Sequence, residues 1–114
     1  MHRETTPARC ERLPGTLHLL ILQTLKGGPL HGYGIAKRIQ QISNDALQVQ
    51  EGSLYPALQR ILRNGWATAE WVPAGPKRRA RVYRLTPAGR RQLEAEAPDL
   101  VRMLEAILRL IQPA

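Results

Sequence analysis

The sequence predicts a mainly helical α+β fold, in which a small β-hairpin separates three short helices from a longer last helix. Apolar residues recur at helical spacing in three short segments before residue 65 and in one longer segment after residue 86. Between residues 66 and 85 the period changes, and Trp, Val, Thr and Tyr become frequent. At 114 residues the chain has the length of one domain.

The first two helices are delimited by capping and turn residues. Thr16 can cap the first helix, which should end at Gly27 and Gly28. Its apolar face comprises Leu17, Leu20, Ile21, Thr24 and Leu25. The second helix is expected to follow the segment GPLHGYG (28–34) and to end at residues 44–45. Its apolar face comprises Ile35, Ile39 and Ile42.

The third helix is expected to begin within GSLYPAL (52–58), with Ser53 as the N-cap residue. Pro56 would then be the third helical residue, where a missing N–H costs no helical hydrogen bond. Tyr55 would face outward beside Gln59, and its hydroxyl could donate to a phosphate or to a base edge. The alternative is that Tyr55 packs over its own helix–turn junction. Core-facing positions are Leu54, Leu58, Ile61 and Leu62, and the helix should end at Asn64 and Gly65.

Residues 66–72 and 81–85 are expected to form the two strands of the hairpin. The intervening PAGPKRRA is rich in turn-forming residues, and it holds Lys77, Arg78 and Arg79 in succession. A charged loop tip can simply be solvated. Three consecutive cations without an acid among them favour contact with phosphate.

The last segment starts with Thr86 as N-cap and Pro87 as the first helical residue. The apolar residues then follow an a/d heptad spacing, which predicts a dimerisation helix because the first three helices have little surface left to cover it. Pro98 predicts a kink or a break near residues 95–98, but not the end of the helix. The candidate dimerisation residues are Leu93, Ala97, Leu100, Leu104, Ile107 and Ile111.

Composition points to nucleic acid as a partner and gives no sign of a metal, a cofactor or a membrane. The chain has 17 Lys plus Arg against 9 Asp plus Glu, a net charge of +8, and most of the cations are Arg. A basic surface kept for solubility is the alternative. Cys10 is the single cysteine, no Cys/His spacing suggests a metal site, and the three His residues are scattered. No apolar run is long enough to span a bilayer, so a cytoplasmic protein is expected.

Three helices, a basic hairpin and a helix for pairing are the plan of a winged helix-turn-helix DNA-binding dimer. The expected division is a loose tail over residues 1–12, a DNA-binding domain over 13–86 and a dimerisation helix over 87–114. An enzyme is not expected, since the three His residues are scattered and Ser53 has no base nearby in the sequence. His31 at a helix start suits a cap or a phosphate contact better than a catalytic role. A module that binds only proteins is the alternative. The candidate DNA-binding residues are His31, Tyr33, Lys37, Ser53, Tyr55, Pro56, Gln59, Arg60, Lys77, Arg78 and Arg79.

Four segments in register resemble the PadR family of bacterial transcriptional regulators, especially its short members with one C-terminal helix, of the kind found as many paralogues in acidobacteria. The segments are GPLHGYGIAKRI (28–39), EGSLYPALQRILRNGW (51–66), AEW (69–71) and RVYRLTPAGRRQL (81–93). The resemblance implies a homodimer on a pseudo-palindromic operator, usually a repressor. It also places Tyr33 and Lys37 near the DNA backbone.

The chain departs from the family pattern in two places. Val82 precedes Tyr83 where the family usually has two adjacent aromatic residues, which affects the packing of the wing. No Trp, Tyr or Phe follows Tyr83, so the drug-binding pocket of the ligand-responsive members is not carried over. An unknown small-molecule effector stays open.

Overall fold

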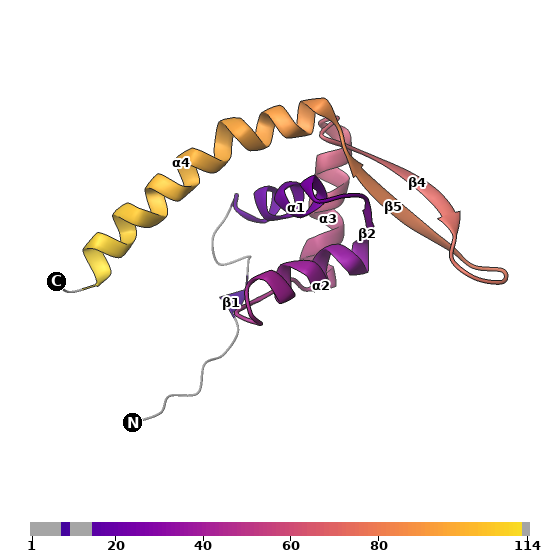
Figure 1. Cartoon of the computed structure of the whole chain (residues 1–114), viewed down its shortest axis with the longest axis horizontal. Coiled ribbons are helices and arrows are strands. Elements are labelled where there is room, and N and C mark those ends of the chain that lie inside the picture. The colour runs from indigo at the N-terminus through magenta and orange to yellow at the C-terminus, as the bar shows by residue number, and fades with distance from the viewer. Residues whose placement is uncertain (1–7, 10–14, 113–114) are drawn as a thin grey trace, which may run out of the picture.

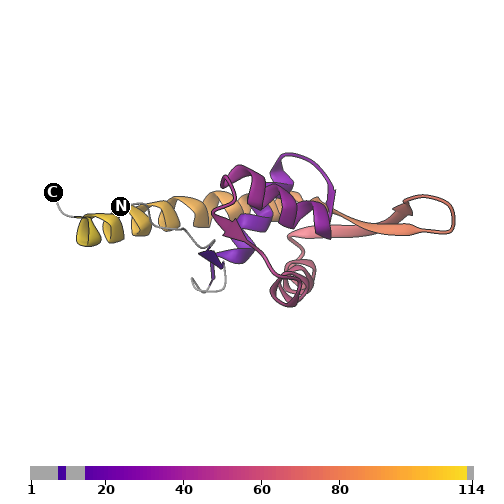
Figure 2. The same ribbon diagram turned by 90° about the horizontal axis from the view of Figure 1, so that it is seen from below.

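Three short helices form the centre of the computed structural model, which describes residues 8–9 and 15–112 (Figure 1). They are α1 (Leu17–Lys26), α2 (Gly32–Ile42) and α3 (Glu51–Arg63). The hairpin of β4 (Ala67–Pro73) and β5 (Arg79–Leu85) follows, and α4 (Pro87–Ile111) ends the fold. The hairpin and the distal half of α4 extend from this centre in opposite directions (Figure 2). The predicted α+β fold class is confirmed.

The core is built around α1, whose Ile21 and Leu22 are fully buried. Each of the three helices turns its apolar face inward, so these faces pack against one another. The other buried apolar residues are Leu19, Leu25, Ile35, Ile39, Leu54, Ala57, Leu58, Ile61, Ala67, Tyr83 and Leu93.

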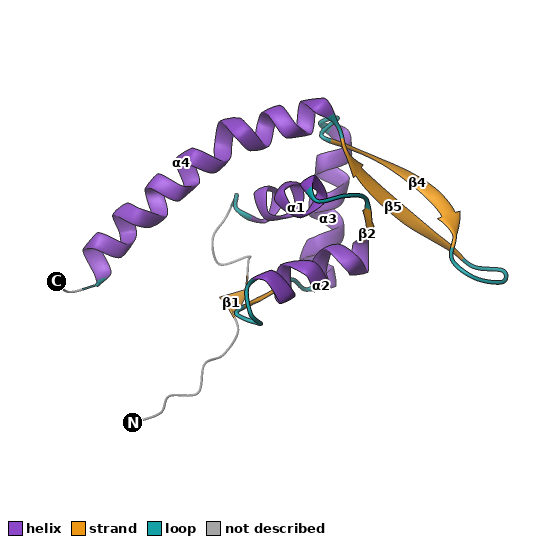
Figure 3. Cartoon of the chain, in the orientation of Figure 1, coloured by secondary structure: helices purple, strands orange, loops and turns teal. Residues whose placement is uncertain are grey.

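A third strand joins the hairpin, and the sequence did not predict it. β2 (Leu30–His31) pairs with β5 in antiparallel orientation, so the sheet order is β2-β5-β4 (Figure 3). Leu30 lies opposite Tyr83 in this register. A strand of two residues is too short to show an alternating pattern in the sequence. Its pairing with β5 attaches the start of α2 to the hairpin.

The N-terminal segment is described only at β1 (Ala8–Arg9), which pairs in parallel with β3 (Leu47–Gln48). These two residues of the predicted loose tail are therefore paired with the segment before α3. The rest of residues 1–12 lies outside the described residues, so the tail stays a prediction.

The bounds of α1 agree with the prediction, and α2 begins earlier than predicted. Thr16 precedes α1 as its N-cap residue without a side-chain capping hydrogen bond, and Gly27 follows as the C-cap. α2 starts at Gly32, inside the segment that was expected to precede it, because His31 caps the helix. Asn44 and Asp45 have φ of 53° and 65°, and this left-handed pair directs the chain toward α3.

The start of α4 is held by the predicted cap and by a close contact. The Thr86 Oγ1 accepts a hydrogen bond from the Gly89 N–H at 3.0 Å and donates one to the Gly65 carbonyl at 2.6 Å. A Cβ on Gly89 would lie 2.0 Å from the Trp66 carbonyl oxygen, so only glycine allows this approach. Farther along, Glu96 lies 2.7 Å from the Nε2 of His18 on α1.

Pro98 does not break α4, which runs over 25 residues without interruption. Its ribbon bends near the middle (Figure 1), as expected where a proline removes one hydrogen bond from the helix. The predicted kink is therefore a bend within one continuous helix.

The heptad stripe of α4 divides into two parts, which corrects the prediction that all of it serves dimerisation. Leu93 is 3% exposed within its own subunit, and Ala97 and Leu100 also pack against the core. α1 thus covers the proximal stripe, which the sequence interpretation had left without an intramolecular partner. Beyond Leu100 the apolar residues are largely exposed, including Leu104 at 37% and Ile111 at 71%. No helix in the described part of the chain combines the length and apolar character needed to cross a membrane.

Candidate nucleic-acid interface

The N-cap and the first two turns of α2 carry three of the predicted site residues close together. The His31 Nδ1 accepts a hydrogen bond from the Gly34 N–H at 2.9 Å, so the prediction of a cap is confirmed. The His31 and Tyr33 rings are stacked with centroids 6.4 Å apart. The Lys37 ammonium lies 5.7 Å from the centre of the Tyr33 ring. Tyr33 is 66% exposed, so this aromatic and cationic cluster faces solvent.

α3 begins three residues earlier than predicted, and Gln50 is its N-cap residue. The prediction that Ser53 caps this helix is therefore wrong, because the Ser53 and Leu54 N–H groups both donate to the Gln50 carbonyl. Pro56 becomes the sixth helical residue instead of the third. Its missing N–H removes the hydrogen bond to the Gly52 carbonyl, so Pro56 does cost one helical bond. That loss falls on the exposed side of the helix.

The side of α3 that points away from the core follows helical spacing. Gly52, Pro56, Gln59 and Arg63 occur at i, i+4, i+7 and i+11, and all four are exposed. The buried residues of the opposite side are Leu54, Ala57, Leu58 and Ile61. Arg63 was not among the predicted site residues, although its spacing from Pro56 and Gln59 would have identified it.

Tyr55 and Arg60 lie on the two flanks of this exposed side. Tyr55 is 49% exposed and leans toward α2, since a Cβ on Gly32 would lie 3.6 Å from the Tyr55 hydroxyl. Arg60 lines a cavity of about 170 Å³ with His18 and Trp66, on the flank that faces α1 and α4. The structure therefore brings Tyr55 to the other aromatic residues of the site and leaves Arg60 apart from them.

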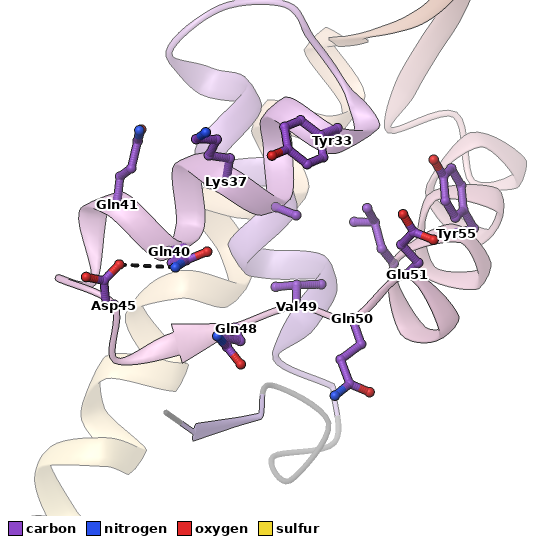
Figure 4. A pocket seen from close by; sticks show the side chains of 12 residues that line it. Tyr33, Lys37, Gln40, Gln41, Asp45, Gln48, Val49, Gln50, Glu51 and Tyr55 are labelled. Atoms are coloured by element: carbon purple, nitrogen blue, oxygen red, sulfur yellow. Dashed lines mark hydrogen bonds between the residues drawn. The ribbon is translucent and has the colours of Figure 1, made fainter. Parts of the chain in front are cut away.

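A groove of about 540 Å³ between α2 and α3 brings several predicted residues together (Figure 4). Tyr33 and Lys37 reach it from α2, and Tyr55 reaches it from α3. At its far end the Gln40 amide donates a hydrogen bond to the Asp45 carboxylate at 3.2 Å. The groove thus runs from the first turn of α2 to the C-terminal end of that helix, and Glu51 lines it at the start of α3.

The basic tip of the hairpin is shorter than predicted, because β4 and β5 extend to Pro73 and Arg79. Lys77 and Arg78 lie in the turn, and Lys77 has a φ of 61°. Arg79 is instead the first residue of β5, and its guanidinium carbon lies 5.8 Å from the centre of the Trp71 ring. The sequence interpretation missed this aromatic partner, because the pairing of the two strands decides which side chains meet.

A second groove, of about 480 Å³, lies between the hairpin and the helices α2 and α3. Tyr55, Tyr83 and Arg81 meet there. Burial raises the pKa of the Tyr83 hydroxyl above its usual 10.0, while the charge of Arg81 acts in the opposite direction. The nearby Tyr55 hydroxyl also raises the Tyr83 pKa, because two phenolates this close would repel each other.

The described residues contain no group of three or more His, Cys, Asp or Glu side chains that could hold a metal ion. Cys10 and His2 lie outside the described residues. Besides the carboxylates of Asp45 and Glu51, the polar groups at the site are amides, hydroxyls, ammonium and guanidinium groups, which include donors suited to phosphate and base edges.

Three packed helices, a β4–β5 wing beside α3 and a long C-terminal helix define a winged helix-turn-helix protein of the transcriptional-regulator class. Residues 21–95 match the model of the transcriptional regulator PadR-like family. The chain therefore belongs to the PadR-like family, as the sequence resemblance predicted. This is a family of transcriptional regulators and not of enzymes.

Two relatives show how far the similarity extends. The chain is 32% identical over 92 residues to the transcriptional regulator Rv3488 of Mycobacterium tuberculosis, which covers 81% of this chain and 82% of that protein. It is 42% identical over 85 residues to an uncharacterized 37.1 kDa protein in transposon TN4556 of Streptomyces fradiae. That match covers 75% of this chain but only 23% of the longer protein.

Two solved structures resemble the fold. A transcriptional regulator from Clostridium thermocellum has a TM-score of 0.79 at 24% identity, and the match covers 90% of this chain and 99% of that one. Bacillus subtilis PadR in complex with operator DNA has a TM-score of 0.65 at 26% identity. In that case the match covers 71% of this chain and 46% of the PadR chain.

Proposed function

We propose that the protein is a sequence-specific DNA-binding transcriptional repressor that acts as a homodimer on a pseudo-palindromic operator. The observation that carries this proposal is the exposed side of α3, which presents Pro56, Gln59 and Arg63 to solvent. The similarity to Bacillus subtilis PadR, which is solved in complex with operator DNA, supports it.

In the proposed complex, α3 enters the major groove, which is wide enough to admit one helix. Gln59 and Arg63 then face base edges, since Gln can pair with adenine and Arg with guanine through two hydrogen bonds each. Lys37 at the start of α2 and Lys77 and Arg78 at the wing tip face phosphates on either side. These cations position the protein, and the α3 side chains read the sequence.

The homodimer part of the proposal rests on the distal half of α4. Val101, Met103, Leu104 and Leu108 are at least 37% exposed there, and no described residue of the same subunit covers them. A second copy can bury this surface through the same residues of its own α4. The two α3 helices would then read half-sites about 10 bp apart, or a multiple of that spacing. A chromosomal regulator of this kind acts in the cytoplasm, and the proposal includes that location.

A gel-shift titration against the DNA upstream of the protein's own gene tests the proposal. We expect a retarded complex that competitor DNA of random sequence displaces poorly. In parallel, the logarithm of the affinity should fall linearly with the logarithm of salt concentration, with a slope of about −0.9 per phosphate contacted. A selection of random oligonucleotides that enriches no common sequence, together with a flat salt response, would favour a module that binds only proteins.

A further inference from the structure

The groove between the hairpin, α2 and α3 collects most of the aromatic residues of the chain. The sequence has two Trp, three Tyr and no Phe, and four of these five residues line this one groove. They are Tyr33, Tyr55, Trp71 and Tyr83. Arg81 lies among them, and Gln59 reaches the groove from the exposed side of α3. The groove is thus continuous with the surface proposed to read DNA.

Strand register places the charged and aromatic residues of the hairpin on one face. Trp71 lies opposite Arg81, Pro73 opposite Arg79 and Ala69 opposite Tyr83. Because alternate residues of a strand share a face, Tyr83, Arg81 and Arg79 line up along β5 with Trp71 beside them. The guanidinium carbon of Arg81 lies 5.9 Å from the centre of the Trp71 ring and 5.8 Å from that of Tyr83.

Arg81 keeps unused hydrogen-bonding capacity. Its side chain makes a hydrogen bond to the Tyr83 hydroxyl, but it takes part in no ion pair among the described residues, and its buried Nε has no hydrogen-bond partner. Arg84 is the natural contrast, because it faces the other side of the hairpin and its guanidinium lies 3.6 Å from the Glu70 carboxylate. A guanidinium beside aromatic rings can still offer N–H donors to an anion, and such contacts limit the freedom of its side chain.

We propose that this groove is a phosphodiester-binding site for one DNA strand, in which Arg81 donates to a backbone phosphate and Trp71 positions Arg81 and Arg79. The aromatic rings around the site can lie against the deoxyribose next to that phosphate. This inference rests on the DNA-binding function proposed above, and it adds a contact at the middle of the wing to those at its tip. Neither Trp71 nor Arg81 was singled out by the sequence as a DNA contact.

The test compares Arg81→Gln with Arg84→Gln, a matched change on the same strand but on the opposite face. Binding of a fluorescent operator is measured by anisotropy over a range of salt concentrations. Arg81→Gln should weaken binding about tenfold to a hundredfold, the equivalent of one lost hydrogen bond to a charged group. Its salt slope should fall by about 0.9. Arg84→Gln should change neither value beyond a factor of about two, because Arg84 lies on the opposite face of the strand from Arg81.

A second measurement locates the phosphate. Each phosphate of the operator is replaced in turn by a neutral methylphosphonate. At one position the replacement should lower the affinity of wild-type protein but leave the affinity of Arg81→Gln unchanged. Trp71→Phe should retain most of the affinity because it keeps a ring, whereas Trp71→Leu should approach the Arg81→Gln value with an unchanged melting temperature. An affinity loss in Trp71→Leu that only tracks a lower melting temperature would make Trp71 structural and overturn its positioning role.

The remaining outcomes distinguish failure of the proposed phosphate site from failure of the proposed DNA-binding function. If wild-type protein prefers its operator but Arg81→Gln has the same affinity and salt slope, the proposed phosphate site is wrong and the proposed DNA-binding function still holds. Wild-type protein without any sequence preference would overturn the function itself. Inorganic phosphate and AMP are titrated alone, with Trp71 fluorescence as the signal. A saturable response at micromolar concentrations that Arg81→Gln abolishes would assign the groove to a free ligand instead of DNA.

Discussion

Gly89→Ala is expected to destabilise the protein strongly, because α4 starts against the backbone of Trp66. The new Cβ would lie 2.0 Å from the Trp66 carbonyl oxygen, whereas a carbon and an oxygen in contact are normally about 3.3 Å apart. Relief requires a shift of more than 1 Å by one of the two segments. The same oxygen accepts a hydrogen bond from the Thr86 N–H at 3.1 Å, so the shift would also strain the cap of α4.

The size of the effect follows from these two terms. Overpacking costs about 1–3 kcal/mol, and loss of the hydrogen bond adds about 1 kcal/mol. The better helix propensity of Ala returns up to about 1 kcal/mol. The net loss is therefore about 1–4 kcal/mol, which should lower the Tm by roughly 4–16 °C in a chain of this length. Calorimetry at one fixed protein concentration measures it, since a dimer makes the Tm depend on concentration.

Gly52→Ala is the matched control, with the opposite expected sign. A Cβ on Gly52 meets nothing within 4 Å, and the residue lies within α3. The substitution should leave the Tm unchanged or raise it by roughly 4 °C at most, through helix propensity alone. A Gly89→Ala protein that melts at or above the wild-type Tm would refute the close packing of α4 on Trp66.

Three further predictions concern assembly and binding. Leu104→Glu with Leu108→Glu should convert a particle of about twice 12.8 kDa into a monomer in sedimentation and weaken operator binding strongly, because both residues are exposed in the subunit. Lys77→Ala with Arg78→Ala should weaken binding to operator and random DNA alike, with a salt slope smaller by about 0.9 per lost phosphate contact in an anisotropy titration. Tyr55→Phe should cost operator affinity by about 1–3 kcal/mol if its hydroxyl bonds a base, and leave the Tm nearly unchanged.

Each of these has a result that contradicts it. A double Glu variant that still sediments as a dimer would remove the distal half of α4 from the interface. Wing-tip variants that lose operator affinity but keep affinity for random DNA would make the tip a reader of sequence. A Tyr55→Phe protein with a lower Tm and an unchanged ratio of operator to random-DNA affinity would make Tyr55 a packing residue against Gly32 and Tyr83.

Capping residues and apolar spacing predicted which helices and strands form, but they predicted some of the helix ends correctly and others wrongly. Thr86 and Pro87 marked the start of α4 correctly, because a cap and a fixed φ act within a few residues of sequence. The same logic failed at α3, where Ser53 is the better cap by type but Gln50 has the extended backbone that a cap requires. The path of the chain between α2 and α3 decided that point, through the left-handed residues Asn44 and Asp45.

The sequence alone determined the order of the helices and strands, the basic turn of the hairpin and the family, because helical and strand periods and caps are encoded over a few neighbouring residues. Only the tertiary structure decided which surfaces meet. It placed Leu93 in the core and left Leu104 exposed, although both belong to one heptad stripe. It also gathered Tyr33, Tyr55 and Trp71 around Arg81, since strand register and helix packing bring together residues that are far apart in the chain.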